Sequence, residues 1–220
     1  MVAKRMAVGL LLAVLVAGSV GAIGVSFGAR ISAGHTFFYG TDYDDDLDFL
    51  EATRDFRFGL EVGGFMELSL TGVFAVQPEV VYVRGGGDFS GESEVGNYSV
   101  EESFNYIGVP VLLKAGFPTQ TGRVFFFVGP CAKFLVGEAS AEITEAGVSV
   151  GGDYDDAFVS PYVISGVGGV GYEIPLGLNW LFFEARTNID FTSVFDPDET
   201  DNYDQRGASV LLGAGFGVLL

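Results

Sequence analysis

The chain has very few cysteine, histidine and basic residues. Its 220 residues include one cysteine (Cys131), one histidine (His35) and only 11 lysines and arginines. A single cysteine excludes an intramolecular disulfide framework and a cysteine-based metal cluster. The net charge of −18 argues against nucleic acid as a partner, because phosphate binding needs Lys and Arg. It argues equally against a basic patch for anionic lipid.

The N-terminus has the layout of a secretory signal. Lys4 and Arg5 form a short positive region, an apolar stretch runs from Met6 to Ala17, and small residues follow up to Ala22. Peptidases cleave after small residues in such segments. The sequence therefore predicts a cleaved signal peptide over residues 1–22.

An uncleaved membrane anchor is the alternative, since no charged residue lies between Met6 and Arg30. The apolar core is short and rich in glycine for a spanning helix. After this segment no apolar run approaches the roughly 20 residues that a membrane helix needs. We therefore expect one mature domain over residues 23–220, with no helical span.

Glycine and aromatic residues are abundant instead, with 33 Gly, 21 Phe and 9 Tyr. This composition favours strands with close backbone approaches. Apolar and polar residues alternate with period two, as in Phe58, Leu60 and Val62 against Arg57 and Glu61. Eight segments follow this pattern, at about 24–39, 54–66, 74–82, 106–117, 123–136, 157–173, 181–191 and 209–220. Their lengths match tilted strands that cross a bilayer, so we predict an all-β fold, an eight-stranded antiparallel up-and-down transmembrane β-barrel.

The connections alternate between long and short. Long ones are expected at 40–53, 85–103, 137–156 and 192–205, and short ones at 69–72, 118–122 and 175–178. The long connections hold 22 of the 29 carboxylates and no Lys or Arg. Barrels of the outer membrane have long outward loops and short periplasmic turns. The sequence thus predicts four acidic extracellular loops on one rim.

Charged residues of both signs share the face opposite the apolar one. A soluble barrel with a salt-bridged surface would explain the pattern too, but the other face is almost entirely aliphatic and aromatic, as lipid requires. Eight strands leave an interior only wide enough for side chains or one small ligand. We expect a lumen filled by paired charges rather than an open pore. The predicted lumen charge network is Arg30, Arg57, Glu61, Glu79, Lys114, Lys133, Glu184 and Arg186.

Four prolines fall inside predicted strands. Pro78, Pro110, Pro130 and Pro161 cannot donate a ladder hydrogen bond, and a closed barrel has no edge strand to hold them. We therefore expect β-bulges at these positions, which would shift the face assignments locally by one residue.

Four segments of the chain form a recognisable set of motifs: Gln77-Pro78-Glu79-Val80-Val81-Tyr82, the segment from Tyr106 through Pro110 to Lys114, Gly129-Pro130, and the glycine-rich stretch 165–173. In these segments the chain resembles the PorT-like outer-membrane β-barrel family. The resemblance spans essentially the whole mature chain. The resemblance implies an outer-membrane barrel in which these prolines are family features, and it implies no specific activity.

Export to the outer membrane of a didermal bacterium implies two partners, the outer-membrane lipid and the barrel-assembly machinery during insertion. The last strand resembles the signal that this machinery recognises, although it ends in Leu220 where a terminal aromatic residue is common.

Two groups of residues invite a chemical role. His35 could serve a lipid-modifying enzyme with a nearby serine such as Ser32, but its parity places it on the lipid side, and an interfacial residue is the simpler interpretation. The acidic run Asp42, Asp44, Asp45, Asp46 and Asp48 offers oxygen ligands for calcium, without the glycine spacing of an EF-hand. We expect a solvated loop that bridges divalent cations or surface partners weakly. No cofactor is expected.

The sequence therefore favours a non-enzymatic structural or surface-interaction protein. A transport or secretion accessory barrel is the second hypothesis, and an envelope-lipid-modifying enzyme is the third.

Overall fold

The computed structural model describes residues 24–93, 96–154, 158–196 and 203–220. The predicted signal peptide at residues 1–22 lies outside the described residues. No helix in the described ranges is long and apolar enough to cross a membrane.

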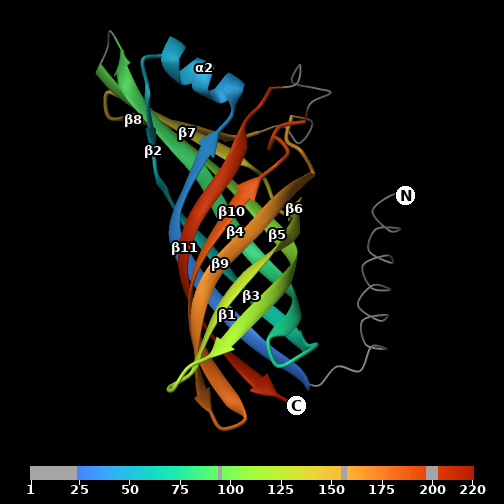
Figure 1. Ribbon diagram of the computed structural model, residues 1–220. Helices are drawn as coiled ribbons and strands as arrows, with labels where there is room; N and C mark the ends of the chain where they lie inside the picture. Colours follow the sequence, from blue (N-terminus) through green and yellow to red (C-terminus); the bar gives the residue numbers. More distant parts are fainter. Residues whose placement is uncertain (1–23, 94–95, 155–157, 197–202) are drawn as a thin grey trace.

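Eight antiparallel strands form a closed ring (Figure 1). Around the ring the order is β4, β3, β1, β11, β10, β9, β6 and β5, and pairing of β5 with β4 closes it. The bounds are β1 (Gly24–Tyr39), β3 (Arg57–Ser69), β4 (Phe74–Ser93), β5 (Gly96–Pro118), β6 (Arg123–Leu135), β9 (Tyr162–Leu176), β10 (Asn179–Asp190) and β11 (Arg206–Leu219). The predicted barrel fold is confirmed.

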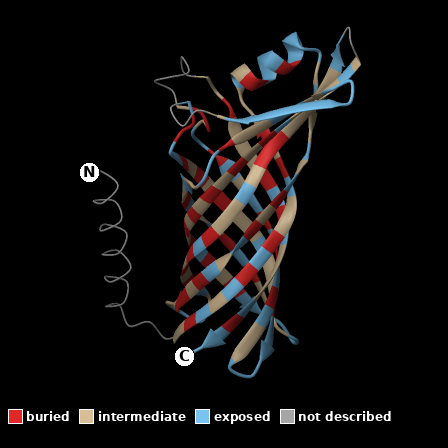
Figure 2. Cartoon of the chain, turned by 180° about the vertical axis from the view of Figure 1, so that it is seen from behind, coloured by how far each residue is buried: buried red, intermediate tan, exposed pale blue. Residues whose placement is uncertain are grey.

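Buried and exposed residues alternate along each ring strand (Figure 2). In β1 the buried Arg30 and Ser32 flank the outward Ile31, whose exposed fraction is 53%. Because successive side chains of a strand point to opposite faces, the period-two pattern puts polar and small residues inside the barrel. The aliphatic and aromatic residues form an apolar outer surface, which suits lipid.

Elements beyond the ring gather at one end of the barrel, which we call the long-loop rim (Figure 1). The connection predicted at 40–53 contains a helix, α2 (Thr41–Phe49), and is followed by the short strand β2 (Thr53–Asp55). A hairpin of β7 (Ser140–Glu145) and β8 (Val148–Asp153) extends the sheet beside β5. Both regions are the long connections that the sequence predicts, and they contain regular elements that the sequence analysis did not predict, because each region supplies apolar residues that pack on the rim.

Most of the connection predicted at 85–103 is strand as well. Strands β4 and β5 continue through it as a long paired ribbon, from Gly85 opposite Phe104 to Ser93 opposite Gly96. The glycines and acidic residues of this segment break the alternation of apolar and polar residues by which strands are recognised. The strands still form, because the hydrogen bonds between them use only backbone groups.

The prolines cause no bulges. Strand β4 keeps one register with β5 on both sides of Pro78, from Phe74 opposite Ala115 to Val81 opposite Gly108. The pairing is only interrupted beside the prolines. Proline lacks a backbone N–H, so it removes a hydrogen-bond donor without adding a residue to the strand. Pro161 precedes β9 rather than lying within it. The expectation of bulges was therefore wrong, and the face assignments stand without a local shift.

Candidate functional site

A cluster of two arginines and three glutamates lies at the centre of the lumen. Arg30 donates from Nη2 to Glu61 at 2.6 Å and from Nε to Glu79 at 3.0 Å. Arg186 donates from Nη1 and Nη2 to the two oxygens of Glu79, both at 3.0 Å, and from Nε to Glu184 at 3.1 Å. All five side chains are buried. Each charged group of the cluster therefore has at least one partner of opposite sign, so none of the five is buried as an unpaired charge.

Two further ion clusters lie nearer the ends of the barrel. Towards the short turns, Lys114 Nζ donates to Glu67 at 2.7 Å and to Glu173 at 2.5 Å. Towards the long-loop rim, Lys133 Nζ lies 2.6 Å from a carboxylate oxygen of Asp190. The lumen thus holds ion pairs at three levels.

Aromatic rings fill the space between the ion clusters. Each of five inward aromatic side chains lies opposite a glycine of the neighbouring strand, and a Cβ added at that glycine would meet the ring at 2.2–2.4 Å. The pairs are Phe65 with Gly28, Phe125 with Gly171, Phe127 with Gly169, Phe182 with Gly215, and Trp180 with Gly217. The lumen glycines therefore make room for rings in a barrel too narrow for two large side chains at one level.

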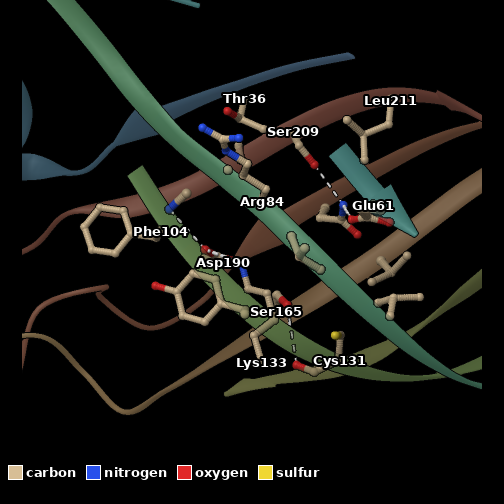
Figure 3. A pocket seen from close by; sticks show the side chains of 18 of the residues that line it. Thr36, Glu61, Arg84, Phe104, Cys131, Lys133, Ser165, Asp190, Ser209 and Leu211 are labelled. Atoms are coloured by element: carbon tan, nitrogen blue, oxygen red, sulfur yellow. Dashed lines mark hydrogen bonds and ion pairs between the residues drawn. The ribbon is translucent and has the colours of Figure 1, made fainter. Parts of the chain in front are cut away.

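Little space remains inside. The cavity in the upper half of the lumen has a volume of about 50 Å³. Figure 3 shows Lys133, Asp190, Cys131 and Ser165 around it. Because one water needs about 10–15 Å³, this cavity suits a few waters rather than an organic ligand.

The eight residues predicted as the lumen charge network occupy four places. Arg30, Glu61, Glu79, Glu184 and Arg186 form the central cluster, whereas Lys114 and Lys133 belong to the two outer clusters. Arg57 lies at the rim end of β3, where Nη1 donates to Asp88 at 2.7 Å and to Glu101 at 3.2 Å. It takes no part in the lumen clusters.

Several lumen residues were missing from the prediction. Glu67, Glu173 and Asp190 complete the outer clusters, and Gln77 links two clusters by donating from Nε2 to Glu79 at 2.7 Å. All four could have been predicted, because each lies at a position of its strand where the alternation of side chains points into the lumen. Glu67 and Glu173 lie near strand ends, where the sequence alone does not show how far a strand extends.

A larger cavity, of about 780 Å³, opens at the long-loop rim. We call it the rim vestibule. It lies between α2, the β4–β5 ribbon, β7 and the segments before β9 and β11. Its lining residues are Tyr43, Asp46, Leu47, Leu50, Phe89, Tyr98, Val100, Glu102, Ala141, Ile143, Glu145, Tyr154, Phe158, Phe195, Tyr203 and Gln205.

Glu102 is the most buried carboxylate of the rim vestibule, with an exposed fraction of 6%. Its oxygens accept hydrogen bonds from the Tyr154 hydroxyl and, at 2.7 Å, from Gln205 Nε2. Burial raises the pKa of this carboxyl, while the two hydrogen bonds act in the opposite direction. Burial and the nearby Glu102 also raise the pKa of the Tyr43 hydroxyl to about 12.

The acidic run expected as a cation-binding loop lies on α2. Three of its side chains have protein partners: Asp44 pairs with Arg54, Asp46 accepts from the Tyr203 hydroxyl, and Asp42 accepts from the Asp204 backbone N–H. In the described ranges no three acidic, His or Cys side chains converge as ligands of a metal ion would.

His35 lies on the outer face of β1, where its ring contacts Phe56 edge-on at a centroid distance of 5.7 Å. Ser32, the serine considered as its nucleophile, is buried on the inner face and accepts a hydrogen bond from Arg30. The strand backbone separates the two side chains, so they form no catalytic pair.

Three solved structures resemble this barrel. The attachment invasion locus protein Ail of Yersinia pestis is 15% identical, with a TM-score of 0.43, over 88% of this chain and 98% of its own. Neisserial surface protein A is 15% identical, with a TM-score of 0.45, over 89% and 98%. The outer membrane protein OprG of Pseudomonas aeruginosa is 10% identical, with a TM-score of 0.42, over 90% and 96%.

Among curated proteins no sequence matches this chain. The family of outer membrane protein β-barrel domains matches residues 23–196, which is most of the chain. A β-barrel domain of the outer membrane is consistent with the closed ring of strands and the apolar outer surface of this chain. The chain therefore belongs to the outer membrane protein β-barrel domain family.

Proposed function

We propose that the protein is a non-enzymatic surface-interaction protein of the outer membrane. The central Arg30–Glu79–Arg186 ion cluster carries this proposal, because it bridges the lumen where a porin would have its channel. With the lumen closed by ion pairs and rings, the barrel serves as an anchor. Function then falls to the long-loop rim.

The rim is suited to contact with partners outside the cell. It carries most of the carboxylates of the chain, an exposed β7–β8 hairpin and the rim vestibule. Long connections of such barrels face outward. We propose that the acidic loops are extracellular and bind surface partners, with divalent cations as weak bridges.

A conductance measurement tests the filled lumen. We expect the refolded barrel to give no porin-like steps in a planar lipid bilayer, with a general porin as the positive control. Regular ohmic steps from the wild-type protein would overturn the proposal. Surface protease on intact cells tests the orientation: cleavage should fall within the long connections, and cleavage only after cell lysis would contradict it.

The PorT-like subgroup is the narrower assignment that we propose. Its support is the Gln77-Pro78-Glu79 motif, in which Gln77 and Glu79 both point into the lumen and bond to each other. We also propose export by cleavage after Ala22 and insertion by the barrel-assembly machinery into outer-membrane lipid. N-terminal sequencing of the membrane form tests the cleavage: the mature chain should begin at residue 23, and any other start would contradict the proposed cleavage position.

The absence of enzyme activity is tested at His35. We expect His35→Ala to leave lipid A acylation in the host unchanged, because its ring packs on Phe56 and its closest serine candidate faces the lumen. A loss of lipid modification in this variant would favour the enzyme hypothesis instead.

A further inference from the structure

The rim vestibule combines aromatic walls with negative charge. Seven of the described residues that line it are aromatic, from α2, the β4–β5 ribbon and the segments before β9 and β11. They are Tyr43, Phe89, Tyr98, Tyr154, Phe158, Phe195 and Tyr203. Among the described residues, the charged ones that line it are Asp46, Glu102 and Glu145, with no lysine or arginine. The volume of about 780 Å³ is typical of sites for small organic molecules.

Glu102 has no cationic partner in the described part of the chain. Three arginines of the rim are paired elsewhere: Arg54 with Asp44, Arg57 with Asp88 and Glu101, and Arg206 with Asp204. A carboxylate removed from water without an opposite charge is costly. A cation that entered the rim vestibule would remove this cost.

The Glu102 carboxylate can accept more hydrogen bonds than it does. A carboxylate offers about four acceptor positions, and the described residues fill two of them, from Tyr154 and Gln205. A primary ammonium group has three N–H donors and no acceptor. Its chemistry therefore fits this carboxylate better than that of a quaternary ammonium, which donates no hydrogen bond.

Aromatic rings favour a cation with an apolar body. Phe89 and Val100 lie opposite each other in the β4–β5 ribbon, and Val100 lies opposite Ile143 of β7. These three side chains form an apolar row across the wall. Tyrosine rings attract a cation through their faces.

We infer that the rim vestibule binds a small organic cation, a primary ammonium group on an apolar body, whose charge pairs with Glu102 and whose body packs between the rings. This inference rests on the proposed function, since it names the ligand class for the rim. A metal ion fits less well, because no three possible ligand side chains converge in the described residues.

Isothermal titration calorimetry on the full-length barrel in nanodiscs of zwitterionic lipid tests the inference. The probe is 4-phenylbutylammonium, with 4-phenylbutanol and 4-phenylbutyrate as neutral and anionic analogues, and empty nanodiscs as the blank. We expect the ammonium compound to bind at least about tenfold more tightly than either analogue, because a hydrogen bond to a charged group is strong when buried.

Two glutamine variants separate the site from the general negative field of the rim. Glu102→Gln keeps the side-chain shape and removes the charge, and it should weaken ammonium binding about tenfold or more. Glu101→Gln removes the same charge one residue away, on the other face of β5, where the carboxylate pairs with Arg57. It should change the affinity less than twofold. Heat-modifiable gel mobility verifies that both variants fold.

Equal binding of the cation and the alcohol, equal effects of the two variants, or no heat of binding at millimolar probe would each overturn the inference. None of these results bears on the filled lumen, which bilayer conductance measures separately. Porin-like steps would conversely overturn the proposed function while the titration still reports on the rim vestibule. Preference for a quaternary analogue of the probe would overturn the hydrogen-bonded geometry with Glu102.

Discussion

Arg186 and Glu79 form a two-pronged ion pair across the full width of the barrel. Arg186 lies on β10 and Glu79 on β4, which are four strands apart in either direction around the ring. Both Nη atoms of the guanidinium donate at 3.0 Å, one to each carboxylate oxygen. Planar bidentate pairing of this kind fixes distance and orientation together. The pair therefore holds opposite walls at one separation.

Glu79→Gln should destabilise the barrel strongly. The substitution leaves Arg186 and Arg30 buried without the carboxylate that both contact, and breaking one partner of a buried ion pair costs about 3–5 kcal/mol. The free energy of unfolding in urea, measured in lipid vesicles, gives the value. Glu101→Gln is the control, because the Glu101 side chain is 53% exposed and Arg57 keeps its second partner Asp88, so the pair contributes about 0–1 kcal/mol.

The same measurement on an Arg186→Met, Glu79→Gln double variant tests the coupling. Because the two residues form one unit, the double variant should lose less than the sum of the single losses. Additive losses, or equal effects of Glu79→Gln and Glu101→Gln, would contradict the role of the cluster in stability.

Gly217→Ala should destabilise the short-turn end of the lumen. A Cβ at this position would lie 2.2 Å from Cζ2 of Trp180, its cross-strand neighbour, so the indole must move. Overpacking of this kind costs about 1–3 kcal/mol. Since Trp180 is the only tryptophan, the fluorescence emission maximum reports its movement directly.

Two further variants complete this test. Gly72→Ala adds the same methyl group where no atom lies within 4 Å, and it should leave both stability and emission unchanged. Adding Trp180→Leu to Gly217→Ala should restore most of the lost stability, because leucine has no atoms where the indole ring would overlap the alanine methyl group. If Gly217→Ala behaves like Gly72→Ala, the glycine is not needed for the ring.

Glu102 should make the rim less stable as the pH rises. Burial raises the pKa of this carboxyl in the folded protein above the value of about 4.3 for an unfolded glutamate. Between the two pKa values the folded state binds more protons than the unfolded state, so stability falls as pH rises through this window. Above the folded pKa the loss is complete and constant.

Hydrogen exchange of the rim amides across this pH range measures the effect. The loss of protection in the wild type should be reduced in Glu102→Gln, whose side chain does not ionise, and it should persist in Glu101→Gln. Protection that rises with pH equally in all three proteins would contradict the assignment.

Cys131 should be unreactive in the folded barrel. Its side chain is buried in the lumen, with an exposed fraction of 5%. A maleimide reagent should therefore label the protein only after heat unfolding. Leu178→Cys adds a thiol at an exposed short turn and should be labelled before heating. Rapid labelling of Cys131 without heat would show that the lumen opens.

The sequence by itself determined the barrel and its two faces. Period-two alternation assigns Arg30 inward and Ile31 outward without any knowledge of the neighbouring strands, because successive side chains of a strand must point oppositely. The alternation of long and short connections likewise predicts the order of the ring. These are local consequences of backbone geometry, so one strand suffices to read each of them.

Parts of the rim could have been found as well. Tyr43 and Leu47 are spaced four residues apart within the acidic run, which places both on one face of a helix. Both are buried against the rim in the structure. The many aspartates, which have low helix propensity, concealed this signal.

Only the tertiary structure decided which charges pair and where a ligand can bind. Glu79 could have met any basic side chain of the inner face, and ring closure selects Arg186 from β10 because those strands lie opposite each other. The rim vestibule depends on closure too, since Tyr43, Glu102 and Tyr203 come from three distant segments. The physical reason is that side-chain direction is a local property, whereas proximity across a lumen is set by strand number and register.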